Sequence, residues 1–107
     1  MKLLTKEVIA KLQPMGSTEN ILVEDKWLKV KFFCPWSNFT WYPVEFDGKD
    51  EFFGLVEGFE FEWVYFTLSE LEMQEGPFGL KIERDLYFTP QKASEITSYG
   101  RGYPIEN

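Results

Sequence analysis

Hydrophobic and polar positions alternate along most of the chain with the spacings of short helices and strands. Residues 5–12 place three apolar side chains on one helical face, and Thr5 supplies a candidate N-cap, which predicts a short helix. Residues 27–34 alternate lysines with apolar side chains, the pattern of a half-buried strand. Residues 39–46 are also strand-like, but Pro43 has no backbone N–H to donate, which predicts an edge strand or a bulge.

The middle of the chain has the pattern of a β-meander. Residues 47–50 begin with Asp-Gly, a strong short signal for a hairpin turn. Strands are predicted on either side of the next turn, over 51–56 and 60–68. Gly54 lies inside the first of them and predicts a bulge or a close approach of another backbone.

The last third of the chain predicts short elements. Ser69 is a candidate N-cap of a short helix, and residues 80–88 are expected to be extended. Thr89 followed by proline predicts a final short helix over 90–97. The whole pattern predicts the α+β class: a mainly antiparallel sheet of about four to five strands, with an N-terminal helix and short C-terminal helices.

Length and composition narrow this picture. A chain of 107 residues fits one domain, for which we expect an ordered core over about residues 3–92 and a loop-like tail over 98–107. The 11 Phe, 5 Tyr and 4 Trp are ample for a core. Charged residues interrupt any signal-peptide core, and no run approaches the roughly 18 apolar residues that cross a bilayer. We therefore expect a cytoplasmic protein with no membrane contact.

The absence of histidine and the single cysteine exclude several kinds of site. A Cys/His zinc site, a Ser-His-Asp or Cys-His triad and an internal disulfide are ruled out. Cys34 is expected to be a small buried hydrophobe. Asp47, Asp50 and Glu51 have too few ligands for a calcium loop, so neither a metal nor a cofactor is expected.

The net charge of −7 arises in one segment. Residues 45–75 contain ten acidic side chains and one lysine. Six of the acids could form a negative ridge that binds the basic groove of a protein that handles nucleic acid: Glu57, Glu60, Glu62, Glu70, Glu72 and Glu75. The alternative is a solvated face that keeps an aromatic-rich protein soluble. Direct binding of nucleic acid is not expected, and the oligomeric state stays open.

An aromatic cluster surrounds the polar residues at 37, 38 and 40. Alternation along a strand sends Phe39 and Trp41 to one face and Tyr42 to the other, which favours core filling. Trp36 and Tyr42 are expected to be the exposed members. As exposed aromatics they are candidate anchors of a protein interface.

A second function class would use the charged triplet Glu83-Arg84-Asp85. Arg84 is expected to form a structural ion pair with a carboxylate, or else to clamp an anion. Glu45 with Asp85 could form an acid/base pair, and Tyr42 could complete a small acid/base enzyme or a small-ligand-binding domain. Without histidine, such an enzyme needs a strongly perturbed carboxylate, lysine or tyrosine.

Three segments resemble the DUF2958 family, small bacterial proteins catalogued only as a domain of unknown function: VKFFCPWSNFTWYPVEFDG, FFGLVEGFEFEWVYFTLSELE and GPFGLKIERDLYFTP. The resemblance covers about residues 1–92 and rests on uncommon strings in a fixed order, FFxPxSxxTWY, FFG, YFxLSEL and GLxIERDLYF. Residues 62–64 depart from it, because family members often have a Leu-Gly pair there. The resemblance implies cargo of plasmids, integrated elements or phages and implies no reaction.

The preferred hypothesis is therefore a non-enzymatic, acidic accessory protein of a mobile genetic element. It would bind a host or phage protein that has a basic surface, as an anti-defence inhibitor or a nucleic-acid mimic. The hypothesis requires the acidic side chains between residues 45 and 75 to form one continuous outward patch.

Overall fold

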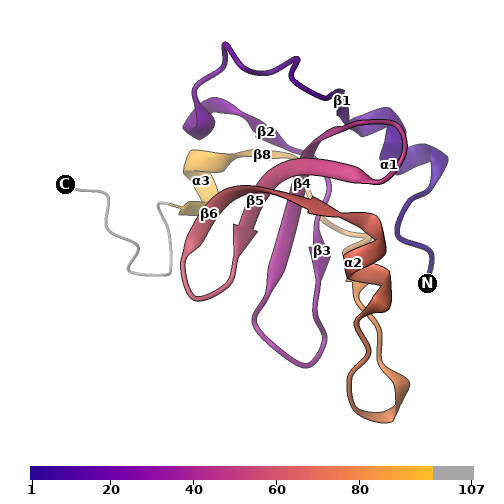
Figure 1. The fold of residues 1–107 in the computed structure, drawn as a ribbon. Coiled ribbons are helices and arrows are strands. Elements are labelled where there is room, and N and C mark those ends of the chain that lie inside the picture. The colour runs from indigo at the N-terminus through magenta and orange to yellow at the C-terminus, as the bar shows by residue number, and fades with distance from the viewer. Residues whose placement is uncertain (98–107) are drawn as a thin grey trace.

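The computed structural model describes residues 1–97, in which short helices surround a mainly antiparallel sheet (Figure 1). The elements in chain order are α1 (Lys6–Lys11), β1 (Gln13–Pro14), η1 (Val23–Asp25), β2 (Trp27–Leu28), β3 (Phe32–Phe33), β4 (Thr40–Phe46), β5 (Glu51–Glu57), β6 (Phe61–Thr67), α2 (Leu68–Met73), η2 (Pro77–Gly79), β7 (Glu83–Arg84), β8 (Gln91–Lys92) and α3 (Ala93–Thr97). Within this described range the main sheet has six strands in the order β6-β5-β4-β3-β7, with β1 pairing in parallel to β4. The expected α+β class is confirmed.

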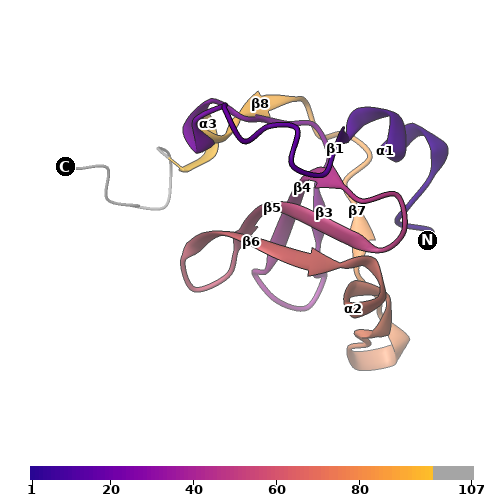
Figure 2. The ribbon, with the colours of Figure 1, turned by 45° about the horizontal axis from the view of Figure 1, so that its top comes forward.

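The middle of the sheet is buried on both faces: every residue of β4 is buried, and its neighbouring side chains point to opposite faces. One cluster combines Trp41, Phe46, Phe52 and Phe66 with residues from α1 and α2. The other contains the following residues: Leu28, Tyr42, Val44, Leu55 and Ala93. Figure 2 shows the small β2–β8 sheet and α3 above the main sheet, where they cover this second cluster.

The local signals at α1 and the β4–β5 hairpin are confirmed. Thr5 caps α1 by accepting a hydrogen bond from the N–H of Val8 at 3.2 Å. Asp47 accepts three hydrogen bonds, from the N–H groups of residues 49, 50 and 51, at 2.8–3.0 Å. Ser69, however, is not the N-cap of α2. Thr67 caps that helix in a capping box with Glu70, and the Ser69 hydroxyl instead donates to Asp50 at 2.7 Å.

A bulge interrupts the pairing of β4 with β5 between Pro43 and Glu45. The prediction that Pro43 lies in an edge strand is wrong, because β4 pairs with both β3 and β5. The alternative prediction, a bulge, is confirmed by the register shift between Pro43 and Glu45. Gly54 lies opposite Pro43, and an added Cβ would be 2.1 Å from the carbonyl oxygen of Tyr42, which confirms the close approach. After the bulge, Glu45 faces the Phe53 side of the sheet.

The predicted strand over residues 27–34 is interrupted. Its predicted alternation of buried and solvent-facing side chains is confirmed, since Leu28, Val30 and Phe32 are buried and the lysines between them are half-buried. Its continuity is wrong, because β2 pairs with β8 in the small sheet whereas β3 joins the main sheet. Lys29 and Lys31 therefore belong to the segment that connects the small sheet to the main sheet.

The C-terminal elements are shorter than predicted. Residues 80–88 form only the two-residue strand β7. The last helix begins at Ala93, and Thr89 does not cap it, because residues 91 and 92 pair with β2. The expected tail over 98–107 lies outside the described residues. Within residues 1–97, no helix has both the length and the apolar character needed to cross a membrane.

Candidate functional site

The acidic segment does not form one continuous patch. Glu57 is buried, with 8% of its surface exposed, so its predicted place on an exposed ridge is wrong. Glu60 and Glu62 are exposed at the start of β6, beside a cavity of about 180 Å³. Glu70 and Glu72 belong to α2, which follows the opposite end of β6 (Figure 1). Strand geometry separates the two pairs by about 20 Å.

Other carboxylates of this segment are used inside the fold. Asp47 caps its turn, and these hydrogen bonds from the backbone hold its pKa below the ordinary value. Asp50 accepts hydrogen bonds from the N–H and the hydroxyl of Ser69 at 2.9 and 2.7 Å. Among residues 1–97 no group of three or more acidic or thiol side chains could hold a metal ion.

The aromatic residues occupy other places than expected. Trp41 and Tyr42 do point to opposite faces, as alternation predicts. Tyr42 is nevertheless 4% exposed and packs against Phe88 with ring centroids 5.6 Å apart, so it is not an exposed anchor. Trp36 is half-buried and lies against Gly76, where an added Cβ would be 2.3 Å from the indole ring.

Glu45 is the centre of a buried polar network that the sequence did not reveal. Its carboxylate accepts hydrogen bonds from the N–H of Gly16 at 2.7 Å, the N–H of Thr18 at 3.0 Å and the Thr18 hydroxyl. Lys26 donates to the carbonyl and hydroxyl oxygens of Thr18 at 2.5 and 2.7 Å. Because an ammonium only donates and a carboxylate only accepts, the Thr18 hydroxyl accepts a hydrogen bond from Lys26 and donates one to Glu45.

This network holds Glu45 in its charged form. Burial by itself raises the pKa of the carboxyl group. The hydrogen bonds from Thr18 and Gly16 and the charge of Lys26 together outweigh burial, so the pKa lies below its ordinary value. Glu45 and Lys26 are only 3% and 4% exposed. The network fixes residues 13–26 on the sheet, and Glu45 is therefore a structural anchor.

The four residues of the enzyme hypothesis do not meet. Glu45 lines a cavity with Gly16 and Lys26, whereas Arg84 and Asp85 line a different one. Tyr42 is buried in the second cluster. The geometry gives no cleft in which these side chains could act on one substrate.

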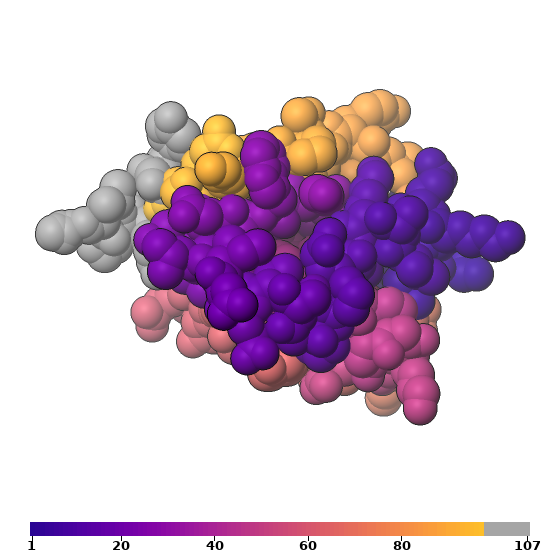
Figure 3. Space-filling model, turned by 90° about the horizontal axis from the view of Figure 1, so that it is seen from above, coloured from indigo at the N-terminus to yellow at the C-terminus, as the bar shows by residue number. Residues whose placement is uncertain are grey.

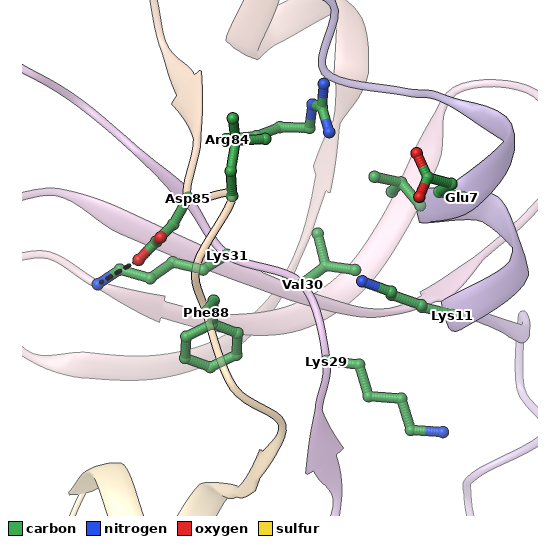
Figure 4. Close-up of a pocket in the computed structure, with 10 residues that line it drawn as sticks. Glu7, Lys11, Lys29, Val30, Lys31, Arg84, Asp85 and Phe88 are labelled. Carbon is green, nitrogen blue, oxygen red and sulfur yellow. Dashed lines mark ion pairs between the residues drawn. The ribbon is translucent and has the colours of Figure 1, made fainter.

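Arg84 and Asp85 lie in a cavity lined mainly by charged residues (Figure 4). Asp85 forms an ion pair with Lys31 at 3.7 Å. The expected ion pair of Arg84 is wrong for the described part of the chain: its Nε donates to the carbonyl oxygen of Lys2 at 2.7 Å, and its guanidinium contacts no carboxylate within residues 1–97.

A projecting segment at residues 68–81, which we call the tip, is exposed over most of its length. Leu71 is buried in the first cluster and fixes α2 to the sheet. Beyond it, Gly76 and Leu80 bond through their backbones at 2.8 Å, and Glu75 forms an ion pair with Lys81 at 3.5 Å. Figure 1 shows this segment projecting away from the sheet.

Phe78 occupies the end of the tip in an unusual conformation. Its φ is 58°, within the left-handed region, and within residues 1–97 it is the one residue other than glycine there. Its side chain is fully exposed, and Met73, at the end of α2, is also largely exposed. No sequence signal indicates that the phenyl ring of Phe78 is left exposed in this turn.

The fold and these surfaces define a small α+β protein with an acidic, aromatic tip and a separate charged cavity. The family model described as "Protein of unknown function" matches residues 3–101, so the chain belongs to the DUF2958 family. No curated protein and no solved structure matches the chain.

Proposed function

We propose that the protein is a non-enzymatic binding protein that docks on a protein partner through the tip. Phe78 enters an apolar pocket of the partner, and Glu70 and Glu72 face basic residues around that pocket. The observation that carries the proposal is the left-handed backbone of Phe78 together with its full exposure. Such a conformation costs about 1–3 kcal/mol for a bulky residue, and strained residues concentrate at functional sites.

The turn presents Phe78 as a rigid group. The backbone pairing of Gly76 with Leu80 and the ion pair of Glu75 with Lys81 fix the two sides of the turn. The Trp36 indole ring packs against Gly76 at the base of the turn, where a side chain at position 76 would collide with the ring. Since the tip is already ordered, little conformational entropy is lost when a partner binds. A few aromatic and arginine side chains that fill pockets of the partner supply most of the binding energy of a typical interface.

The charge of the tip supports a basic partner. Glu70, Glu72 and Glu75 lie on it, and Lys81 is the one cation between residues 68 and 81. Opposite charges would speed the encounter, and the complex would weaken as salt screens them. An accessory role in a mobile genetic element, including inhibition of a host or phage protein, belongs to this proposal. Mimicry of nucleic acid does not, because the carboxylates are dispersed.

Affinity capture with matched variants tests the proposal. The immobilised wild type, Phe78→Ala and Phe59→Ala proteins are exposed to lysate of the source organism at low and high salt. Phe59 is the matched control because it is equally exposed but lies at the β5–β6 turn beside Glu60 and Glu62. We expect a protein retained by the wild type and by Phe59→Ala, lost with Phe78→Ala, and released by salt. Loss with Phe59→Ala alone would move the docking site to that turn.

A further inference from the structure

Two neighbouring cavities on the side of the molecule away from the tip concentrate positive charge. The first, about 130 Å³, lies between α1, the segment joining β2 to β3, and the residues after β7 (Figure 4). The second, about 280 Å³, lies between residues 11–29 and Val44. Both are lined by Lys11 and Lys29, so the two cavities adjoin. Figure 3 shows the N-terminal residues covering most of this face, beside the orange and yellow C-terminal part of the described chain.

The charges around the pair of cavities oppose the charge of the whole protein. Five cationic residues line them: Lys11, Lys26, Lys29, Lys31 and Arg84. Only Glu7 and Asp85 are acidic, both in the first cavity, and Asp85 is neutralised by Lys31. The second cavity is lined by no acidic side chain. Lys26 is balanced by Glu45, so Lys11, Lys29 and Arg84 are the cations around the cavities without an ion pair within residues 1–97, in a chain of net charge −7.

Three of these cations have donors left for a ligand. The ammonium groups of Lys11 and Lys29 form no ion pair within residues 1–97, and the guanidinium of Arg84 uses only its Nε, on a backbone carbonyl. In Figure 4 the Lys11 side chain reaches from α1 towards Val30, at the middle of the cavity. Lys26 is already occupied by Thr18, and it belongs to the wall.

The second cavity adds an apolar surface to the charge. Ile21, Trp27 and Val44 line it, and the first two are about half-exposed, at 45% and 49%. One face of the Trp27 indole carries Lys92 at 6.0 Å. Pockets that bind small molecules combine such apolar walls with a few charged groups that fix orientation.

We propose that the paired cavities bind a small organic phosphate. The phosphate group lies between Lys11 and Lys29, the two cations that line both cavities, where charge-assisted hydrogen bonds are available. The apolar part of the molecule lies against Ile21 and Trp27. This site uses other residues than the tip and does not depend on the proposed docking function.

Phenyl phosphate, inorganic phosphate and phenol are the probes, titrated at low salt into the full chain and followed by amide chemical shifts in NMR spectra. Phenyl phosphate is expected to bind about tenfold more tightly than inorganic phosphate, because the ring buries apolar surface. Phenol is expected to produce no shifts at the same concentrations. The shifts should centre on residues 11, 21, 27 and 29.

Variants decide whether these cavities are the site. The double variant Lys11→Ala/Lys29→Ala should weaken phenyl phosphate at least about tenfold, since it removes two charged donors. Lys6→Ala/Lys49→Ala removes the same charge elsewhere and should leave binding unchanged. Ile21→Ser should abolish the advantage of phenyl phosphate over inorganic phosphate while phosphate still binds.

Three results would overturn the proposal. The first is the absence of shifts at millimolar phenyl phosphate. The second is equal weakening by the two lysine double variants, which would show attraction to the whole surface rather than to the cavities. The third is tighter binding of a short single-stranded oligonucleotide than of phenyl phosphate, which would make nucleic acid, and not a small phosphate, the ligand.

Discussion

The replacement Glu45→Gln tests whether the buried network anchors residues 13–26 to the sheet. The variant keeps the size of the side chain but removes its charge and one of its two acceptor oxygens. The carboxylate accepts hydrogen bonds from Gly16 and Thr18 on different oxygens, so at least one donor loses its partner. Lys26 also loses the negative charge that balances its own.

The magnitude follows from the number of bonds lost. A hydrogen bond to a charged group contributes about 1.5–3 kcal/mol, and the variant loses one to two of them. We therefore expect the free energy of unfolding to fall by about 3 kcal/mol, a large share of the about 5–15 kcal/mol typical of a domain. In a chain of this size the midpoint of thermal unfolding would fall by more than about 10 °C.

The free energies of unfolding of Glu45→Gln and Glu51→Gln, measured in urea and by heating, are compared with that of the wild type. Glu51 is the control because it is an exposed glutamate whose replacement removes the same charge. The second arm is Lys26→Met alone and combined with Glu45→Gln, where the two effects should fall short of additivity by about 1 kcal/mol or more. Equal stability of the two glutamine variants, or strict additivity of the pair, would refute the network as an anchor.

The pH dependence gives an independent check with a defined sign. The pKa of Glu45 is lower in the folded than in the unfolded chain, where the ordinary value is 4.5. Its contribution to stability is therefore complete above that pH and is lost as the pH falls through the folded-state pKa. The difference in stability between the wild type and Glu45→Gln should shrink over that acidic range, and a constant difference would contradict the assignment.

Three further predictions concern single positions. Phe78→Gly should raise the free energy of unfolding by up to about 1 kcal/mol in urea titrations, because it removes the left-handed strain at no cost in buried contacts, and a loss of stability would show that the ring supports the fold. Gly54→Ala should destabilise by about 3 kcal/mol or prevent folding, because the new Cβ meets the backbone of β4. Gly48→Asn, in open space at φ 87°, should cost only about 1 kcal/mol in the same assay, because asparagine tolerates the left-handed region better than other side chains. The pKa of Asp47, followed by carboxyl NMR, should be below its ordinary value of 3.8, and an ordinary value would contradict the cap.

Short-range signals predicted most of the fold. The Thr5 cap, the turn at residues 47–50, the bulge near Pro43 and the meander all follow from local chemistry, and each is present. The errors arise where tertiary pairing decides. The strand over 27–34 divides because β8, more than 60 residues later, pairs with its first half, and Thr89 is not a cap because residues 91 and 92 serve that pairing.

The charged surfaces are harder to predict than the fold, because a run of like charges along the chain does not determine where those charges lie in space. The segment 45–75 is acidic in sequence, but its carboxylates lie on different faces and ends of the sheet, and Glu45 and Glu57 are buried. The cationic cavities could not be predicted from the sequence, because the residues that line them come from separate segments around residues 11, 29 and 84. The exposure of Phe78 could not be predicted from the sequence either, since it depends on whether residues distant in the chain pack against the ring.

Site-specific photocrosslinking from the tip tests the central claim most directly. A photoreactive phenylalanine analogue is placed at position 78 in one protein and at position 59 in another, and both are irradiated in lysate of the source organism. The account predicts one discrete adduct from position 78 that disappears at high salt or when Glu72 is replaced by lysine, and no such adduct from position 59. An adduct from position 59 alone, or an adduct from position 78 that salt and the charge reversal leave unchanged, would contradict docking through an acidic tip.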